Sequence, residues 1–252
     1  MSLLANTIYH TEFVVNLGSS MVFDYVIFKK PCIYINYDVT NCVIKEWTVK
    51  KIYNYVQGKT RYVSIQLGIG SWKPMIVKDV DKLGYGDCKA LTNYTRVLLE
   101  NVGVSSFFTV IYGDSNKRDF DKDFVSIQGN HVILSIPYNN EYKFLECTSQ
   151  TSPFAYGGNF TDDRYALIIK PEGGEIVKTN EWNEKQTIQS TKGTYTIDEN
   201  GKLVASFTIE SSGLFYEKYQ LKSMSHADLM DYYKSDFSGL TNLKITKSNL
   251  ED

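Results

Sequence analysis

The stretch GYGDCKALTNYTRVLLENVGV, Gly84 to Val104, decides how the centre of this 252-residue chain is interpreted. Apolar side chains recur at helical spacing after Cys88, and Gly103 is a suitable helix end. The pattern therefore predicts a helix that begins near Cys88. A cysteine in a first helical turn lies beside unpaired main-chain N–H groups, at the positive end of the helix dipole, and both stabilise a thiolate. Cys88 is therefore a candidate nucleophile, with a small buried residue as the alternative.

A nucleophilic cysteine needs a basic partner, and the chain has only three histidines. His10 lies in the separate N-terminal region, and His226 lies in a polar helix predicted over residues 217–233. His131 begins a predicted strand, NHVILSIP, 43 residues after Cys88. The sequence therefore favours His131 as the base.

A second predicted strand, YKFLECTS (142–149), contains Glu146. A four-residue connection from Pro137 to Asn140 would set Glu146 opposite His131 on the same face, whereas a slip of one residue would move it to the other face. The pairing predicts a nucleophile, a base and a carboxylate that orients the base: Cys88, His131 and Glu146. The alternatives are a polar residue at a strand end for His131 and a solvated charge for Glu146.

The composition limits the class of protein. A hydrophobic content of 42% supports a substantial core, and a net charge of −2 favours neither nucleic acid nor an anionic membrane as partner. No apolar run is long enough for a transmembrane helix, and the first residues lack the pattern of a signal peptide. The four cysteines show neither zinc spacing nor a disulfide framework. Taken alone, these features predict a cytoplasmic chain without a metal.

Other segments have simpler patterns. A helix is expected from Trp47 to Gly58, after a junction at 39–46, and a glycine-rich extended segment at 61–74. A strand at 107–114 precedes a charged, exposed loop at 115–124. Hairpins are expected at 166–178 and at 193–211, the latter turning at Asn200-Gly201, and a last strand at 242–249.

Together, Gly-Asp-Cys opening a helix, the NHVILSIP strand and FLECTS resemble the transglutaminase-like superfamily over residues 47–175, most closely a bacterial subgroup with flanking domains of unknown function. The resemblance implies an α+β fold with a papain-like core and a Cys-His-Asp triad. Cys88 is then the nucleophile and His131 the base. Glu146 takes the position usually held by Asp, and Cys147 one often held by Pro. Residues 188–252 resemble part of the β-rich domain that follows the core.

The resemblance implies attack on a carboxamide or peptide bond of a protein or peptide substrate through a thioester, followed by hydrolysis or transamidation, with no cofactor. The Cys88 amide would bind a developing oxyanion, and Gln66 or Trp72 is a candidate second donor, with ordinary packing as the alternative. A module that has lost activity and keeps the fold for binding is the alternative function. Oligomeric state stays open, and the family suggests the bacterial envelope.

Residues 1–42 resemble the nucleotide-binding part of a glycosyltransferase or glycerophosphate transferase, in one Rossmann-like β-α-β unit with strands at 12–16 and 31–38. Gly18, Ser19 and Ser20 would bind a phosphate at the helix start. A serine N-cap after a turn glycine explains the same letters. A single unit has no acceptor site, so a remnant or a fusion junction is expected, and a nucleotide-sugar transferase is the third hypothesis.

Overall fold

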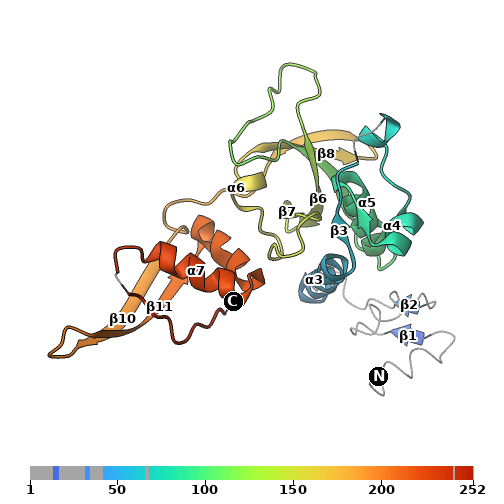
Figure 1. Cartoon of the computed structure of the whole chain (residues 1–252). Coiled ribbons are helices and arrows are strands. Elements are labelled where there is room, and N and C mark those ends of the chain that lie inside the picture. Colours follow the sequence, from blue (N-terminus) through green and yellow to red (C-terminus); the bar gives the residue numbers. More distant parts are fainter. Residues whose placement is uncertain (1–13, 17–31, 35–41, 66–67, 241, 252) are drawn as a thin grey trace. The chain divides into compact units, whose positions relative to one another are not determined.

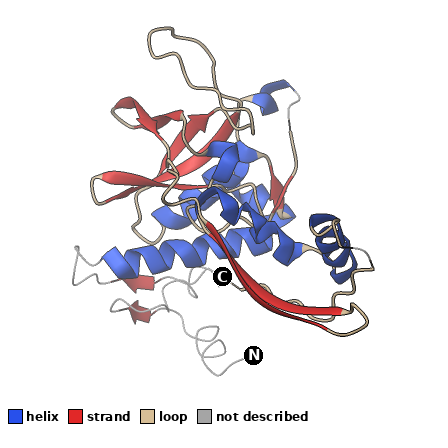
Figure 2. Cartoon of the chain, turned by 90° about the vertical axis from the view of Figure 1, so that its left-hand side faces the viewer, coloured by secondary structure: helices blue, strands red, loops and turns tan. Residues whose placement is uncertain are grey.

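The computed structural model describes residues 14–16, 32–34, 42–65, 68–240 and 242–251 (Figure 1). The chain divides into two compact units. One consists of Met1–Gln150 and Phe154–Asn180, and the other of Thr151–Pro153 and Glu181–Asp252. Both contain helices and strands (Figure 2), which confirms the α+β class predicted from the sequence.

The first unit is built on a five-stranded antiparallel sheet with the order β7-β6-β5-β8-β9. Its strands are β5 (Phe107–Ile111), β6 (His131–Tyr138), β7 (Glu141–Leu145), β8 (Tyr165–Lys170) and β9 (Gly173–Lys178). The predicted strand at 107–114 and the predicted hairpin at 166–178 are therefore confirmed. The long connection from β5 to β6 contains the charged segment, which is exposed as expected.

Three helices form the core with this sheet: α3 (Cys42–Lys59), α4 (Val77–Leu83) and α5 (Cys88–Glu100). Helix α5 lies beside β6 (Figure 1). Because β6 is buried at six consecutive positions, it separates two apolar clusters. The larger includes Ile52, Tyr53, Leu91, Tyr94, Leu134 and Leu145, and the smaller is Ile111, Ile133, Phe144 and Ala166.

The helices depart from the sequence prediction in two places. Helix α3 begins at Cys42, within the predicted junction, and runs through Gly58 to Lys59. Helix α4 lies where only an extended segment was predicted, and Gly84 ends it with a φ of 70°. Upstream, the extended segment forms the two-residue strand β3 (Arg61–Tyr62), then the short 3₁₀ helix η1 (Gly68–Ser71). Strand β3 pairs in parallel with β4 (Tyr85–Gly86), directly before Cys88.

The hairpin formed by β6 and β7 has a shorter connection than predicted. Its turn is Asn139-Asn140, with φ of 50° and 64°, rather than the four residues from Pro137 to Asn140. Asparagine tolerates this left-handed conformation better than most residues, so both strands extend to the turn. The register pairs Tyr138 with Glu141 and is therefore displaced by two residues from the prediction. A two-residue displacement leaves every side chain on its predicted face.

The second unit contains the hairpin β10 (Gln189–Ile197) and β11 (Leu203–Ser211), followed by the 3₁₀ helix η2 (Gly213–Ser223) and α7 (His226–Asp236). The hairpin predicted at 193–211 is confirmed. The single helix predicted at 217–233 is wrong, because Ser225 caps a new helix there by accepting a hydrogen bond from the Asp228 amide. The predicted strand at 242–249 is wrong as well: these residues are neither helix nor strand.

In the N-terminal region, β1 (Val14–Asn16) pairs in parallel with β2 (Cys32–Tyr34), as a β-α-β unit requires. Gly18, Ser19 and Ser20 lie outside the described residues, so the phosphate site stays a prediction. Of the helices within the described residues, none has the length and hydropathy that crossing a bilayer requires.

Candidate active site

Cys88 is the first residue of α5, and Asp87 caps this helix. The Asp87 carboxylate accepts a hydrogen bond of 2.9 Å from the Ala90 amide and also contacts the Lys89 ammonium. Gly86 allows the chain to pass close to the helix, because a Cβ there would come within 2.8 Å of the Ala90 Cβ. The local sequence thus sets the Cys88 sulfur, in a side chain that is 8% exposed, at the helix N-terminus.

One turn further along α5, a buried hydrogen bond connects the helix to the predicted base. The Thr92 hydroxyl donates to the carbonyl oxygen of Val132 at 3.2 Å. Val132 is next to His131, the first residue of β6. This contact brings the first turn of α5 to the head of β6, where Cys88 lies close enough to His131 to affect its pKa.

His131 and Glu146 form a buried ion pair. His131 Nε2 lies 2.8 Å from Glu146 Oε2, and both side chains are less than 10% exposed. Burial by itself lowers the pKa of His131, but the charge of Glu146 and the interaction with Cys88 outweigh it and raise the pKa to about 10. Burial acts to raise the pKa of Glu146, but His131 and Thr148 bring it below its ordinary value. Since Nε2 is bound to Glu146, Nδ1 is the ring nitrogen that remains for Cys88.

Two residues that sequence reasoning missed fix the position of Glu146. The main-chain N–H of Thr148 donates to Glu146 Oε1 at 2.9 Å, and the Thr148 hydroxyl donates to the same oxygen. The Tyr53 hydroxyl, from α3, donates to the Glu146 carbonyl oxygen at 3.0 Å. A hydroxyl residue two positions after an acid is a recognisable signal for Thr148. Nothing in the sequence points to Tyr53, which is 93 positions away.

The His131 ring has two further neighbours. The Phe160 ring meets it edge-on with centroids 5.1 Å apart, from the short helix α6 (Gly158–Thr161). Gly113 packs against its other atoms, since a Cβ at that position would lie 3.0 Å from the His131 Cβ. Asn130 holds Gly113 by accepting from its amide at 2.7 Å. These contacts limit the orientation of the imidazole.

The remaining sequence candidates are not brought to this site. Gln66 lies outside the described residues, and the Trp72 side chain is 66% exposed, so the second oxyanion donor stays a prediction. Cys147 is a core residue whose burial raises the pKa of its thiol to about 12. Within the described ranges, no group of three or more His, Cys, Asp or Glu side chains is arranged to hold a metal ion.

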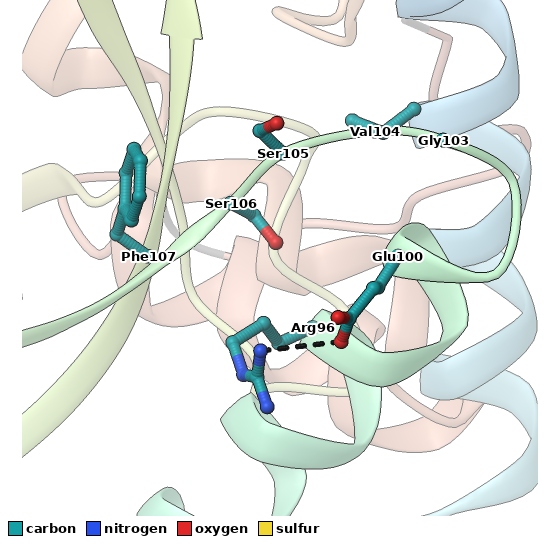
Figure 3. A pocket seen from close by; sticks show the side chains of 7 residues that line it. All are labelled: Arg96, Glu100, Gly103, Val104, Ser105, Ser106 and Phe107. Atoms are coloured by element: carbon teal, nitrogen blue, oxygen red, sulfur yellow. Dashed lines mark hydrogen bonds and ion pairs between the residues drawn. The ribbon is translucent and has the colours of Figure 1, made fainter. Parts of the chain in front are cut away.

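An open hollow of about 300 Å³ lies at the other end of α5 (Figure 3). It is lined by Arg96, Glu100, Gly103, Val104, Ser105, Ser106 and Phe107. Arg96 and Glu100 form an ion pair of 3.3 Å across it. Because an α-helix rises about 1.5 Å per residue, the hollow is roughly 18 Å from Cys88 and separate from the candidate site.

Comparison with known proteins gives one likeness. No protein-family model matches the sequence, and no curated protein matches it. Among solved structures, the chain is similar to a protein from Parabacteroides distasonis described as a "putative protease", with a TM-score of 0.40 and 12% identity. The match covers 54% of this chain and 24% of that one, so the chain spans about a quarter of its length.

Proposed function

We propose that this chain is a transglutaminase-like cysteine enzyme with a papain-like core, which acts on carboxamide or peptide bonds. Cys88 is the nucleophile, His131 the base and Glu146 the carboxylate that orients the base. The observation that carries the proposal is the buried 2.8 Å contact between His131 and Glu146, beside a cysteine at a helix N-terminus. Such a constellation is the requirement for nucleophilic catalysis by a thiol.

The reaction follows from these roles. His131 Nδ1 takes the proton of the Cys88 thiol, and the sulfur attacks the carbonyl carbon of the substrate. The main-chain N–H of Cys88 donates a hydrogen bond to the oxyanion. The C–N bond then breaks, and the proton on His131 passes to the departing ammonia or amine, which leaves a thioester on Cys88. Water or a second amine, deprotonated by His131, attacks the thioester and restores the thiol.

Glu146 supports both protonation states of this cycle. Its contact with Nε2 fixes the tautomer that leaves Nδ1 free to accept the thiol proton, and its charge stabilises the imidazolium that forms. With the pKa of His131 raised to about 10, an imidazolium beside a thiolate is the favoured resting pair near neutral pH. Glutamate is longer than the aspartate usual in the family, and Thr148 holds the carboxylate from the far side.

The rate of Cys88 alkylation by iodoacetamide, measured from about pH 4 to pH 9, tests the proposal. We expect a rapid phase that persists below pH 7 and falls at least tenfold in His131→Ala, because the imidazolium stabilises the reactive thiolate. Cys88→Ala gives the background from the other cysteines, and Cys147 should add little since its thiol is buried. A rate that rises as for an ordinary thiol, equally in both proteins, would refute the pair.

Glutamine peptides then separate the two outcomes of the thioester. Ammonia release without amine incorporation identifies a hydrolase, and incorporation of a labelled primary amine identifies an acyltransferase. Cys88→Ala should abolish both.

A binding module without activity is the second candidate, and the low exposure of Cys88, 8%, favours it. It predicts an inert thiol with normal folding. Absence of alkylation in the folded chain, with full alkylation after denaturation, would support this candidate.

A further inference from the structure

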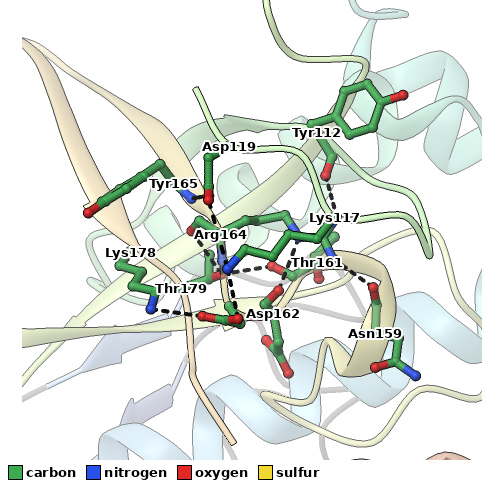
Figure 4. Close-up of polar contacts among 11 residues, drawn as sticks. Tyr112, Lys117, Asp119, Asn159, Thr161, Asp162, Arg164, Tyr165, Lys178 and Thr179 are labelled. Atoms are coloured by element: carbon green, nitrogen blue, oxygen red, sulfur yellow. Dashed lines mark hydrogen bonds and ion pairs between the residues drawn. The ribbon is translucent and has the colours of Figure 1, made fainter. Parts of the chain in front are cut away.

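Arg164, which directly precedes β8, is the largest fully buried side chain in the described residues, with 1% exposure. Its guanidinium makes four hydrogen bonds, all to main-chain carbonyl oxygens (Figure 4). The acceptors are Asp162 at 3.0 Å, Tyr112 at 2.8 Å, Asp114 at 2.9 Å and Asn159 at 2.7 Å. One side chain thus holds two segments that are far apart in the sequence.

This arrangement is costly for a purely structural residue. A buried charge is destabilising unless it is compensated, and burial lowers the pKa of Arg164. None of its four hydrogen bonds is to a carboxylate. The neighbouring Asp163 is paired instead with Lys117 and Lys178, each at 2.8 Å. The geometry of five fixed donors, rather than ion pairing, accounts for an arginine at this position.

Both segments held by Arg164 contact the His131 ring. The first, residues 112–114, contains Gly113, which packs on His131. The second, residues 159–162, contains Phe160, which meets the ring edge-on. The two segments are also bonded to each other, because the Asp114 amide donates to the Phe160 carbonyl oxygen at 3.1 Å.

We propose that Arg164 is a positioning residue for the base: it holds the 112–114 and 159–162 segments against His131 and so fixes the orientation of the imidazole between Glu146 and Cys88. This inference rests on the proposed function. Arg164 itself contacts neither the thiol nor the ion pair, so its effect passes through Gly113 and Phe160.

Arg164→Lys tests the proposal, because an ammonium keeps the charge but cannot reach four carbonyl groups at once. We expect the alkylation rate of Cys88 near pH 6 to fall about tenfold, and the NMR signal of the His131 Nε2 proton to broaden as the ring becomes mobile. The matched control is Arg96→Lys, since Arg96 lies on the exposed side of α5 with Glu100. It should change neither quantity by more than about twofold.

Phe160→Ala examines the route. Phe160 is 42% exposed, so the variant should fold while losing the ring that packs on His131. We expect the same two changes as in Arg164→Lys. The double variant should be no worse than Arg164→Lys, because both changes act through one contact. Multiplied effects in the double variant would overturn the proposal.

The outcomes separate this inference from the proposed function. If wild-type Cys88 shows no reactivity dependent on His131, the proposed function fails, and the Nε2 proton signal alone decides whether Arg164 orients the ring. A folded Arg164→Lys with unchanged His131 signal and alkylation overturns the inference. If Arg164→Lys does not fold, Phe160→Ala decides: an altered His131 signal supports the proposal, and an unaltered one overturns it.

Discussion

Two hairpins of this chain, β6–β7 and β10–β11, have the same antiparallel pairing and opposite environments. Strand β6 is buried on both faces, whereas β10 and β11 are exposed almost throughout. In β10–β11 the polar and apolar side chains alternate, so that Tyr195 and Phe207 share one face and Thr194 and Ser206 the other. In β6 the apolar run is continuous. Continuity therefore marks the strand that crosses a core, and polar residues at its ends are the unusual ones.

The largest expected difference between the hairpins is in core stability. Ile133→Ala in β6 should lower the free energy of unfolding by about 2–5 kcal/mol, because its side chain is 1% exposed and truncation leaves a cavity. Ile197→Ala in β10, where the side chain is 60% exposed, should change it by less than about 0.5 kcal/mol. Urea denaturation of both variants measures the difference. Equal losses would mean that an unseen partner covers β10–β11.

The second difference is in pH dependence. The pKa of His131 is raised from 6.5 to about 10, so its pair with Glu146 stabilises the folded state fully below about pH 6.5, and this contribution is lost as the pH rises through about 10. Unfolding free energy should fall by up to about 1.4 kcal/mol per pH unit in that window. On the acid side, the contribution of Glu146 is lost as the pH falls through its lowered pKa.

Urea denaturation of the wild type and His131→Gln between about pH 6 and pH 10.5 measures this dependence. The slope should vanish in the variant. Since β10–β11 contains no histidine, its residues should not contribute to the slope in this window. An identical slope in the two proteins would show that another group titrates.

The smallest expected difference is in the turns. Gly201→Ala in the β10–β11 loop should cost about 1 kcal/mol, because Gly201 has a φ of 78° and a Cβ there would meet no neighbour within 4 Å, so only backbone strain opposes the change. Asn140→Gly in the β6–β7 turn, where φ is 64°, should change stability by only a few tenths of a kcal/mol. Thermal denaturation measures both. A large loss in Asn140→Gly would reveal a side-chain role in the turn.

The sequence predicted local features well, because these are encoded by neighbours. The helix at Cys88 follows from its periodicity and its Asp87 cap, and the strands that carry His131 and Glu146 follow from their apolar runs. The hairpin connection was predicted two residues too long. The error did no harm to the pairing of His131 with Glu146, because side-chain direction in a strand repeats every two residues.

Features that depend on distant parts of the chain were not predictable. The contact of Tyr53 with Glu146 and the main-chain acceptors of Arg164 are made by tertiary structure, and carbonyl groups carry no sequence signal. Helix α4 was missed because its seven residues are too few to establish a helical period. The strand predicted at 242–249 lacks a pairing partner within the described residues, so its alternating pattern did not suffice.

The four carbonyl contacts of Arg164 also have a consequence for hydrogen exchange. Since one guanidinium joins residues 112–114 to 159–162, neither segment can detach without breaking bonds of the other. The Asp114 amide, bonded to Phe160, and the Gly113 amide, bonded to Asn130, should therefore open as one cooperative unit, with similar protection. The connection between β5 and β6 would then divide into a slowly exchanging base beside the histidine and a rapidly exchanging tip at residues 120–127.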